Sequence, residues 1–357
     1  MNFHASAALL LALSLTGCDT KDETTPGLPP VSADYDAAHD TSEFKCVYES
    51  ANLPASNSEV ELLYQYGMHL AAAIEPEDLD KIARYFRIAA AHGHYPAATG
   101  LEDLLLQQKI STAKRVDEII NLMKHLTTED IPWAHLYMSA YLGLGYGVKQ
   151  DIPASQHYLR RAADLGSPEA QYSIAREGIY YPDPPAITRP MLRCAMLQGH
   201  VNATYLYFEM TPDNKNYGEA LPGLQSAVKS GNEESASFLA KAFNPTRLTG
   251  DSIAFTSEDS AERSRRYALI AKFLARYRNL HPQLPDIDQI VPLPPANLPV
   301  WDGTYQWKRE WDAAITPLPP SDELVARMSR EKDLDPNTGR QLSALKLKLR
   351  SFTDKIF

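Results

Sequence analysis

Residues 141–175 read YLGLGYGVKQDIPASQHYLRRAADLGSPEAQYSIA, and this stretch decides the fold. Three glycines, Gly143, Gly145 and Gly147, stand at alternate positions in it. A glycine-rich loop that binds phosphate follows a strand and opens a helix. The residues before Gly143 do not alternate between apolar and polar, and those after Gly147 place apolar residues at helical spacing. The glycines therefore indicate a turn between two helices rather than a nucleotide site.

The second of these two helices recurs along the chain. Gly166, which ends it, has counterparts in Gly93, Gly199 and Gly231, at successive spacings of 73, 33 and 32 residues. An alanine stands four residues before each glycine, and a large apolar residue stands seven residues before it. A small residue stands four residues after each glycine, and an apolar residue stands eight residues after it. The wide first spacing holds a degenerate copy, whose glycine is lost near Thr127.

Each position of the repeat has a physical role. Residues seven and four before the glycine lie three apart, so they share one helical face. The alanine lets a neighbouring helix approach closely, and the glycine ends the helix with a left-handed backbone. A repeat of about 33–36 residues with two helices predicts an all-α solenoid, because a single helix pair cannot bury its own apolar face.

The quoted stretch resembles the Sel-1-like repeat, a tetratricopeptide-like helix pair. The matching residues are Leu142-Gly143, the turn 145–148 (Gly-Tyr-Gly-Val), Asp151, and 162–166 (Ala-Ala-Asp-Leu-Gly). The units around Gly199 and Gly231 lack the Gly-x-Gly-Val turn. The resemblance covers residues 58–243 and implies a right-handed α-solenoid that binds proteins, not an enzyme, and one that needs no cofactor.

The first residues have the pattern of a secretory signal. The apolar run from Ala5 to Leu15 is too short to cross a bilayer, which needs about 20 residues, and suits the apolar region of a signal peptide. It leads into Leu15-Thr16-Gly17-Cys18, which resembles the lipobox of bacterial lipoproteins. That resemblance implies cleavage before Cys18, lipidation of its sulfur and an anchor on the periplasmic side of the cell envelope, with Asp19 favouring the inner membrane. The alternative is an ordinary signal peptide, residues 1–17, followed by a chance cysteine.

Residues 18–45 are polar, acidic and proline-bearing, which predicts a disordered tether. Residues 19–80 carry fourteen Asp or Glu against Lys21 and Lys45, so they account for −12 of the overall net charge of −10. No basic stripe with interleaved aromatic residues occurs, which argues against a nucleic-acid partner. The run LKLKLR at 345–350 indicates a terminal amphipathic helix with a solvated basic face.

Two cysteines remain if Cys18 is lipidated. Cys46 opens the predicted folded region, and Cys194 falls in a repeat helix. In an envelope compartment the two could form a disulfide. The alternative is that both are small buried apolar side chains.

The sequence contains no pattern of a catalytic or metal site. It has no Gly-x-Ser-x-Gly elbow, no His-Glu-x-x-His and no Cys-x-x-Cys. The pair His92 and His94 could offer two metal ligands, but it falls at a predicted helix end, where a histidine favours the dipole. Asp286 and Asp288 lie two apart without further ligands nearby. We therefore expect no catalytic residue, metal or cofactor.

The repeat stops near residue 245. One more amphipathic helix follows, with Tyr267, Ile270 and Phe273 on one face. Nine prolines then fall in residues 282–320, a density that argues against regular helix or sheet. The stretch DQIVPLPPANLPVWDG resembles an uncharacterised C-terminal domain found with Sel-1-like repeats in proteobacterial lipoproteins. We expect repeats over 46–245 and a helical, proline-rich domain over 246–357 that caps the solenoid.

Lipoproteins with these repeats resemble those encoded beside phospholipase effectors of the type VI secretion system. That resemblance implies an immunity protein that inhibits a lipase-type toxin in the periplasm. An envelope scaffold or regulatory adaptor with Sel-1-like repeats is the alternative. The neighbouring genes would distinguish the two.

Overall fold

The structure is a computed structural model, and it describes residues 35–38, 42–54, 57–71, 79–110, 112, 114–181, 184–211, 216–246, 253–313 and 318–343. Within these ranges the protein is all-α, as predicted, and the sole strand-like pairing is an isolated bridge between Leu334 and Gln341. The longer helices are α1 (Ser58–Ala71), α2 (Leu79–Ala91), α3 (Tyr95–Leu106), α4 (Arg115–Thr128), α5 (Pro132–Leu144), α6 (Ile152–Asp164), α7 (Pro168–Ile179), α8 (Thr188–Leu197), α9 (Val201–Glu209), α10 (Leu221–Lys229), α11 (Glu233–Ala242), α12 (Ser260–Arg276), α14 (Gln306–Ala313) and α15 (Asp322–Glu331).

The chain divides into two compact units, with the division inside α4. Of the described residues, one unit holds those within 53–122 and 318–343, and the other holds those within 35–52 and 123–313. The residues predicted as one C-terminal domain, 246–357, are therefore divided: α12 and α14 belong to the second unit and α15 to the first.

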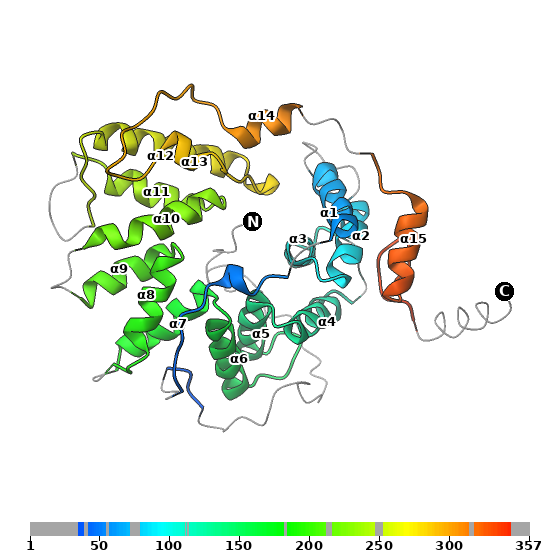
Figure 1. Ribbon diagram of the computed structural model, residues 1–357. Coiled ribbons are helices and arrows are strands. Elements are labelled where there is room, and N and C mark those ends of the chain that lie inside the picture. Colours follow the sequence, from blue (N-terminus) through cyan, green and yellow to red (C-terminus); the bar gives the residue numbers. More distant parts are fainter. Residues whose placement is uncertain are drawn as a thin grey trace. The chain divides into compact units, whose positions relative to one another are not determined.

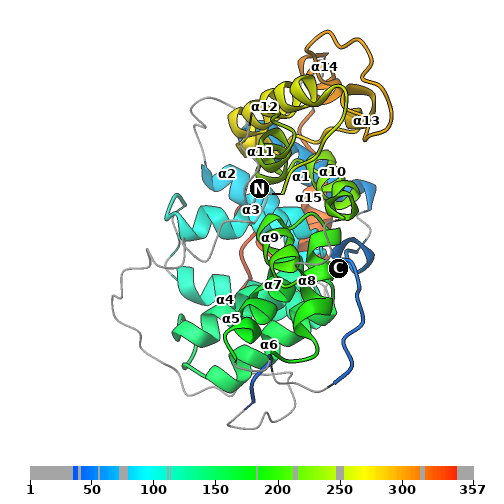
Figure 2. The ribbon, with the colours of Figure 1, turned by 90° about the vertical axis from the view of Figure 1, so that its left-hand side faces the viewer.

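The second unit is a run of helix pairs with two layers. Each helix from α5 to α9, and again from α10 to α12, packs against the next one along the chain. The first helices of successive pairs, α7, α9 and α11, also contact one another, as do the second helices α8 and α10. Figures 1 and 2 show these pairs stacked in sequence order. This arrangement is that of an α-solenoid.

The repeat glycines end helices as predicted. Gly93, Gly166, Gly199 and Gly231 all have positive φ, between 80° and 105°. The residue after each glycine donates its N–H to the carbonyl of the alanine that stands four residues before the glycine. An example is the bond from Ser167 to Ala162, at 2.9 Å. This is the hydrogen bond of a Schellman helix end.

The degenerate copy ends at Asp130, not near Thr127 as predicted. Asp130 has φ 52°, and the N–H of Ile131 donates to the carbonyl of Leu126 at 3.2 Å. Aspartate adopts the left-handed region more readily than most residues, since its short side chain can bond locally. Because an aspartate ends this helix, the sequence has no glycine there to mark the turn.

The turn between α5 and α6 contains the three alternate glycines. Gly143 lies in the last turn of α5, and Gly145 ends that helix with φ 71°. Gly147 also has positive φ, 67°. The Asp151 side chain then accepts a hydrogen bond from the N–H of Ala154 and caps α6. These glycines therefore form a turn between two helices, not a phosphate loop.

Residues 35–38 and 42–52 lie along the second helices of the repeat, and we call them the N-terminal strap. Ala37 and Ala38 are fully buried. Arg160 of α6 donates to the carbonyl of Ser42 at 3.2 Å. Part of the tether predicted over 18–45 thus belongs to the folded unit; its residues before 35 lie outside the described ranges. The predicted tether ended too late in the chain, because acidic composition does not reveal the main-chain contacts that residues 35–38 and 42–45 make.

The proline-rich stretch lies over α10 and α12 and includes two helices. Short α13 (Ile287–Ile290) and α14 (Gln306–Ala313) both form there, contrary to the expectation of no regular helix. The reason for α14 is that residues 300–316 contain no proline. We call residues 282–313 the capping segment.

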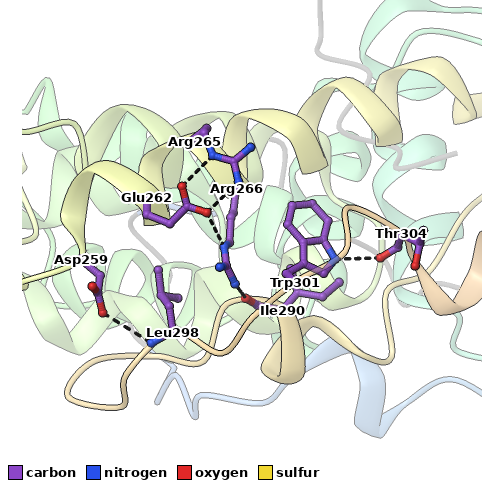
Figure 3. Close-up of polar contacts among 8 residues, drawn as sticks. All are labelled: Asp259, Glu262, Arg265, Arg266, Ile290, Leu298, Trp301 and Thr304. Atoms are coloured by element: carbon purple, nitrogen blue, oxygen red, sulfur yellow. Dashed lines mark hydrogen bonds and ion pairs between the residues drawn. The ribbon is translucent and has the colours of Figure 1, made fainter.

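Side chains of α12 hold the capping segment by its main chain. Arg266, buried on α12, donates to the carbonyl of Ile290 at 2.7 Å and to Glu262 at 2.8 Å (Figure 3). Buried Arg263 donates to the carbonyls of Pro292 and Ala296. A proline-rich segment cannot satisfy its carbonyls in a regular ladder, so arginine donors replace the missing partners.

In the first unit, α15 and the residues after it pack against α2. Arg84 donates to the carbonyl of Pro336 at 2.6 Å, and Arg87 to that of Thr338 at 3.2 Å. Here again arginines of a repeat helix bind the carbonyls of a segment outside the repeat.

Candidate partner-binding surface

The predicted site residues fall in different places. Cys18 lies outside the described residues, and so does the run 345–350. Cys46 of the strap and Cys194 of α8 form a disulfide, with Cα atoms 5.5 Å apart. Gly166 lies beneath the strap: a Cβ atom built there would be 2.5 Å from the main-chain nitrogen of Glu49.

The histidines singled out in the sequence cap helices and bind other groups. The Nε2 atom of His92 lies 2.9 Å from the carbonyl oxygen of Met328. His94 accepts a hydrogen bond at Nδ1 from the N–H of Ala97, and its Nε2 lies 3.0 Å from Glu61. Burial lowers the pKa of His94. Both ring nitrogens of His94 are thus engaged in holding the fold, which leaves no lone pair for a metal or a substrate proton.

No group of three or more potential metal ligands occurs in the described part of the chain. Within those ranges no helix is long and apolar enough to cross a membrane. Asp286, one of the two aspartates singled out, is buried and accepts a hydrogen bond from the N–H of Gln306 at 2.8 Å. Its carboxylate therefore ties the start of α14 to the start of α13 within the capping segment.

The second-helix side of the solenoid is partly covered by the chain itself. The strap bridges α6 and α8: Glu49 donates its N–H to Gln198 at 2.8 Å, and Asn52 donates to the carbonyl of Leu165 at 2.7 Å. The capping segment bridges α10 and α12, where Gln225 donates to the carbonyl of Val291 at 2.8 Å.

Between these two bridges, α8 and α10 pack directly on each other. A Cβ atom on Gly223 of α10 would lie 2.4 Å from the carbonyl oxygen of Leu197, the last residue of α8. The two backbones touch at this point. Along α6 to α12 the second helices are therefore partly covered, by the strap, by the capping segment and by each other.

The first helices instead carry an exposed stripe. Positions three, six and ten after each repeat glycine lie on one helical face. The residues of this stripe, which we call the first-helix face, are Tyr172 and Arg176 on α7, Asn202, Tyr205 and Glu209 on α9, and Glu234 and Lys241 on α11. All except Tyr172, which is half-buried, are exposed. The other two of these nine positions hold half-buried residues, Glu169, which bonds to His200, and Ser237.

Two tyrosines occupy equivalent positions on the first-helix face. Tyr172 and Tyr205 each stand six residues after a repeat glycine. Tyr205 is 37% exposed and meets Phe238 edge-on, with ring centroids 5.1 Å apart. Tyr172 stacks on His200 at 4.6 Å, and the Arg176 guanidinium lies 5.7 Å from its ring centroid. Each ring is held in place by a neighbouring repeat, so little side-chain entropy remains to be lost on binding.

The charges of the first-helix face are balanced. Arg176 and Lys241 oppose Glu209 and Glu234, and in the described part of the chain none of the four forms an ion pair with another residue. Tyrosine and arginine are enriched at protein interfaces, so this face is the candidate surface for a partner. The sequence contains nineteen tyrosines, and composition alone does not show which of them face solvent. The signal that could have identified Tyr172 and Tyr205 is their shared distance from a repeat glycine.

Comparison with known proteins bears on the fold. The model of a family described as a domain of unknown function (DUF6396) matches residues 235–342, which span α11 to α15. A search of curated proteins found no match.

Three solved structures from Pseudomonas aeruginosa are similar to this chain. PA5086 is 23% identical, with a TM-score of 0.51 over 71% of this chain and 95% of its own. The immunity proteins PA5087 and PA5088 are each 24% identical, with TM-scores of 0.50 and the same coverage. These likenesses show that the chain shares the fold of those proteins.

Proposed function

We propose that the protein is an immunity protein that binds and inhibits a secreted toxin through its first-helix face. The observation that carries the proposal is the division of the solenoid's surface. The second helices are partly covered by the strap and the capping segment, while Tyr172 and Tyr205 remain presented at equivalent positions on α7 and α9. The fold shared with two proteins named as immunity proteins supports the same conclusion.

The toxin in this proposal is a lipase-type effector of the type VI secretion system that acts in the periplasm. The lipobox resemblance at Cys18 supports lipid anchoring there, and two acyl chains would hold the protein firmly to a membrane. Stoichiometric inhibition needs affinity on the order of nanomolar, or about 12 kcal/mol. A face that spans three helices could supply such an interface with rigid aromatic anchors and no cofactor.

A growth competition tests this function. A strain that delivers the effector encoded beside this gene would be grown with recipients that lack the gene, or that carry it on a plasmid. Protection by the plasmid is expected. Equal survival of both recipients would contradict the immunity function and favour an envelope scaffold.

A further inference from the structure

The Cys46–Cys194 disulfide joins two residues of very different exposure. Cys46 is exposed on the strap, whereas Cys194 on α8 is 1% exposed. A thiolate from solvent therefore approaches the disulfide from the side of Cys46. Attack on Cys46 makes Cys194 the leaving group, since thiol exchange displaces the sulfur opposite the attacking one.

A cavity beside this disulfide contains two arginines. Its volume is about 320 Å³, and its lining residues are Phe44, Cys46, Arg189, Pro190, Arg193, Cys194 and Tyr207. Arg193 is paired with Glu219. Arg189, one helical turn away, bonds to the carbonyl of Met210 at 3.3 Å and has no carboxylate partner in the described part of the chain. A guanidinium beside a disulfide attracts an attacking thiolate and favours exchange.

The disulfide is the one covalent link between the strap and α8. The other strap contacts near α8 are single hydrogen bonds, such as Gln171 of α7 to the carbonyl of Val47 at 3.3 Å and the N–H of Glu49 to Gln198 at 2.8 Å. Each such bond contributes only about 1 kcal/mol. Lys45, next to Cys46, is 77% exposed. Around Cys46 the disulfide is thus the strongest link between the strap and α8.

We propose that Cys46 is a site of thiol–disulfide exchange with a dithiol, and that opening of the disulfide releases the part of the strap around Cys46 from α8. The attacking thiolate bonds to Cys46 Sγ, the bond to Cys194 breaks, and Cys194 leaves as a thiolate that takes a proton from water. The second thiol of the dithiol then displaces Cys46. Two electrons pass to the chain, and the dithiol becomes a disulfide.

The first experiment follows release of the strap. The purified full chain, oxidised or reduced with dithiothreitol and alkylated, is digested briefly with trypsin, and peptides cut after Lys45 are quantified. Cleavage after Lys149, in the turn between α5 and α6, is the internal reference. We expect cleavage after Lys45 to rise roughly ten-fold on reduction, because the segment then opens locally, while cleavage after Lys149 stays constant.

The double variant Cys46→Ser, Cys194→Ser provides the same comparison without reductant and should behave as the reduced chain. Its circular dichroism checks that the helices persist. If cleavage after Lys45 is unchanged in both the reduced chain and the variant, the strap stays bound without the disulfide and the proposal is overturned.

A second experiment tests the route of attack. The rate of disulfide opening by dithiothreitol is measured for the wild type, for Arg189→Gln, and for Arg265→Gln as a control on distant α12. We expect Arg189→Gln alone to slow opening several-fold, with the difference shrinking in high salt because the charge is solvent-exposed. Equal rates for wild type and Arg189→Gln would overturn the role of the cavity.

Discussion

His200 and Glu169 are joined across two repeats: the Nε2 atom of His200 lies 2.9 Å from the carboxylate of Glu169. The Nδ1 atom of the same ring accepts a hydrogen bond from the N–H of Ala203 and caps α9. His94 and Glu61 repeat this arrangement at the start of α3, with a distance of 3.0 Å. The main-chain N–H of each histidine thus closes the Schellman turn, while its imidazole caps the next helix and ties that helix to the first helix of the preceding repeat.

The role of His200 predicts a graded effect of substitution. His200→Ala removes both bonds and should lower the free energy of unfolding by about 1–2 kcal/mol, the usual cost of losing an N-cap. His200→Asn should recover part of the loss, because Asn232 already caps α11 in the next repeat through its side chain. Urea unfolding of the two variants measures this difference. Equal unfolding free energies for His200→Ala and His200→Asn would mean that the side-chain cap of α9 contributes nothing to stability.

Gly166 and Gly93 provide a matched pair for the strap. Both have positive φ, 105° and 80°, so alanine at either should cost about 1 kcal/mol for its left-handed backbone. A Cβ atom at Gly93 meets nothing within 4 Å, whereas one at Gly166 meets the main chain of Tyr48 and Glu49 at 2.5 Å. Gly166→Ala should therefore cost a further 1–3 kcal/mol, roughly the effect of overpacking. Equal melting temperatures for the two variants would show that the strap does not cover Gly166.

Arg265 and Arg266 test how the capping segment is held. Both bond to Glu262, but only Arg266 also donates to the carbonyl of Ile290 (Figure 3). Arg266→Gln should lower the unfolding free energy by about 1–3 kcal/mol, because a buried carbonyl loses its partner. Arg265→Gln removes a solvent-exposed ion pair and should leave the unfolding free energy nearly unchanged. Chemical denaturation of both variants measures the two unfolding free energies. A larger loss of stability for Arg265→Gln than for Arg266→Gln would contradict the role of Arg266 in holding the capping segment.

His135 predicts that the protein loses stability in acid. Burial lowers the pKa of His135 from 6.5 to about 4. The unfolded chain takes up this proton first, so stability is complete above pH 6.5 and falls as the pH drops toward 4. At pH 5 the loss from this one residue is about 2 kcal/mol relative to pH 7. His135→Gln should reduce the difference between urea midpoints at pH 7 and pH 5, and an unchanged difference would exclude His135 as the cause.

The sequence predicted the repeat because each of its positions has a fixed packing role. The alanines before the glycines, Ala162 and Ala195 among them, are fully buried, and the glycines adopt the left-handed backbone that helix ends require. The caps at Ser167 and Asn232 could have been read from the residue after each glycine, whereas histidine is not a usual capping residue.

The extended segments were harder to foresee. The strap and the capping segment are held by side chains that bind main-chain carbonyls, such as Arg160 to Ser42 and Arg266 to Ile290. A carbonyl is present at every residue, so these pairings leave no pattern in the sequence of the segment itself. The first-helix face was hidden for a related reason: exposure depends on which helices become neighbours.

Direct binding to the co-encoded effector tests the central claim, that α7 and α9 present the partner site. The purified chain and its Tyr172→Ala, Tyr205→Ala double variant would be titrated with that effector by calorimetry. Tyr180→Ala is the control, since Tyr180 is 84% exposed but lies outside the first-helix face. The account predicts nanomolar binding by the wild type and the control, and a loss of roughly 100-fold or more in the double variant. Unchanged affinity of the double variant, or no binding by the wild type, would contradict it.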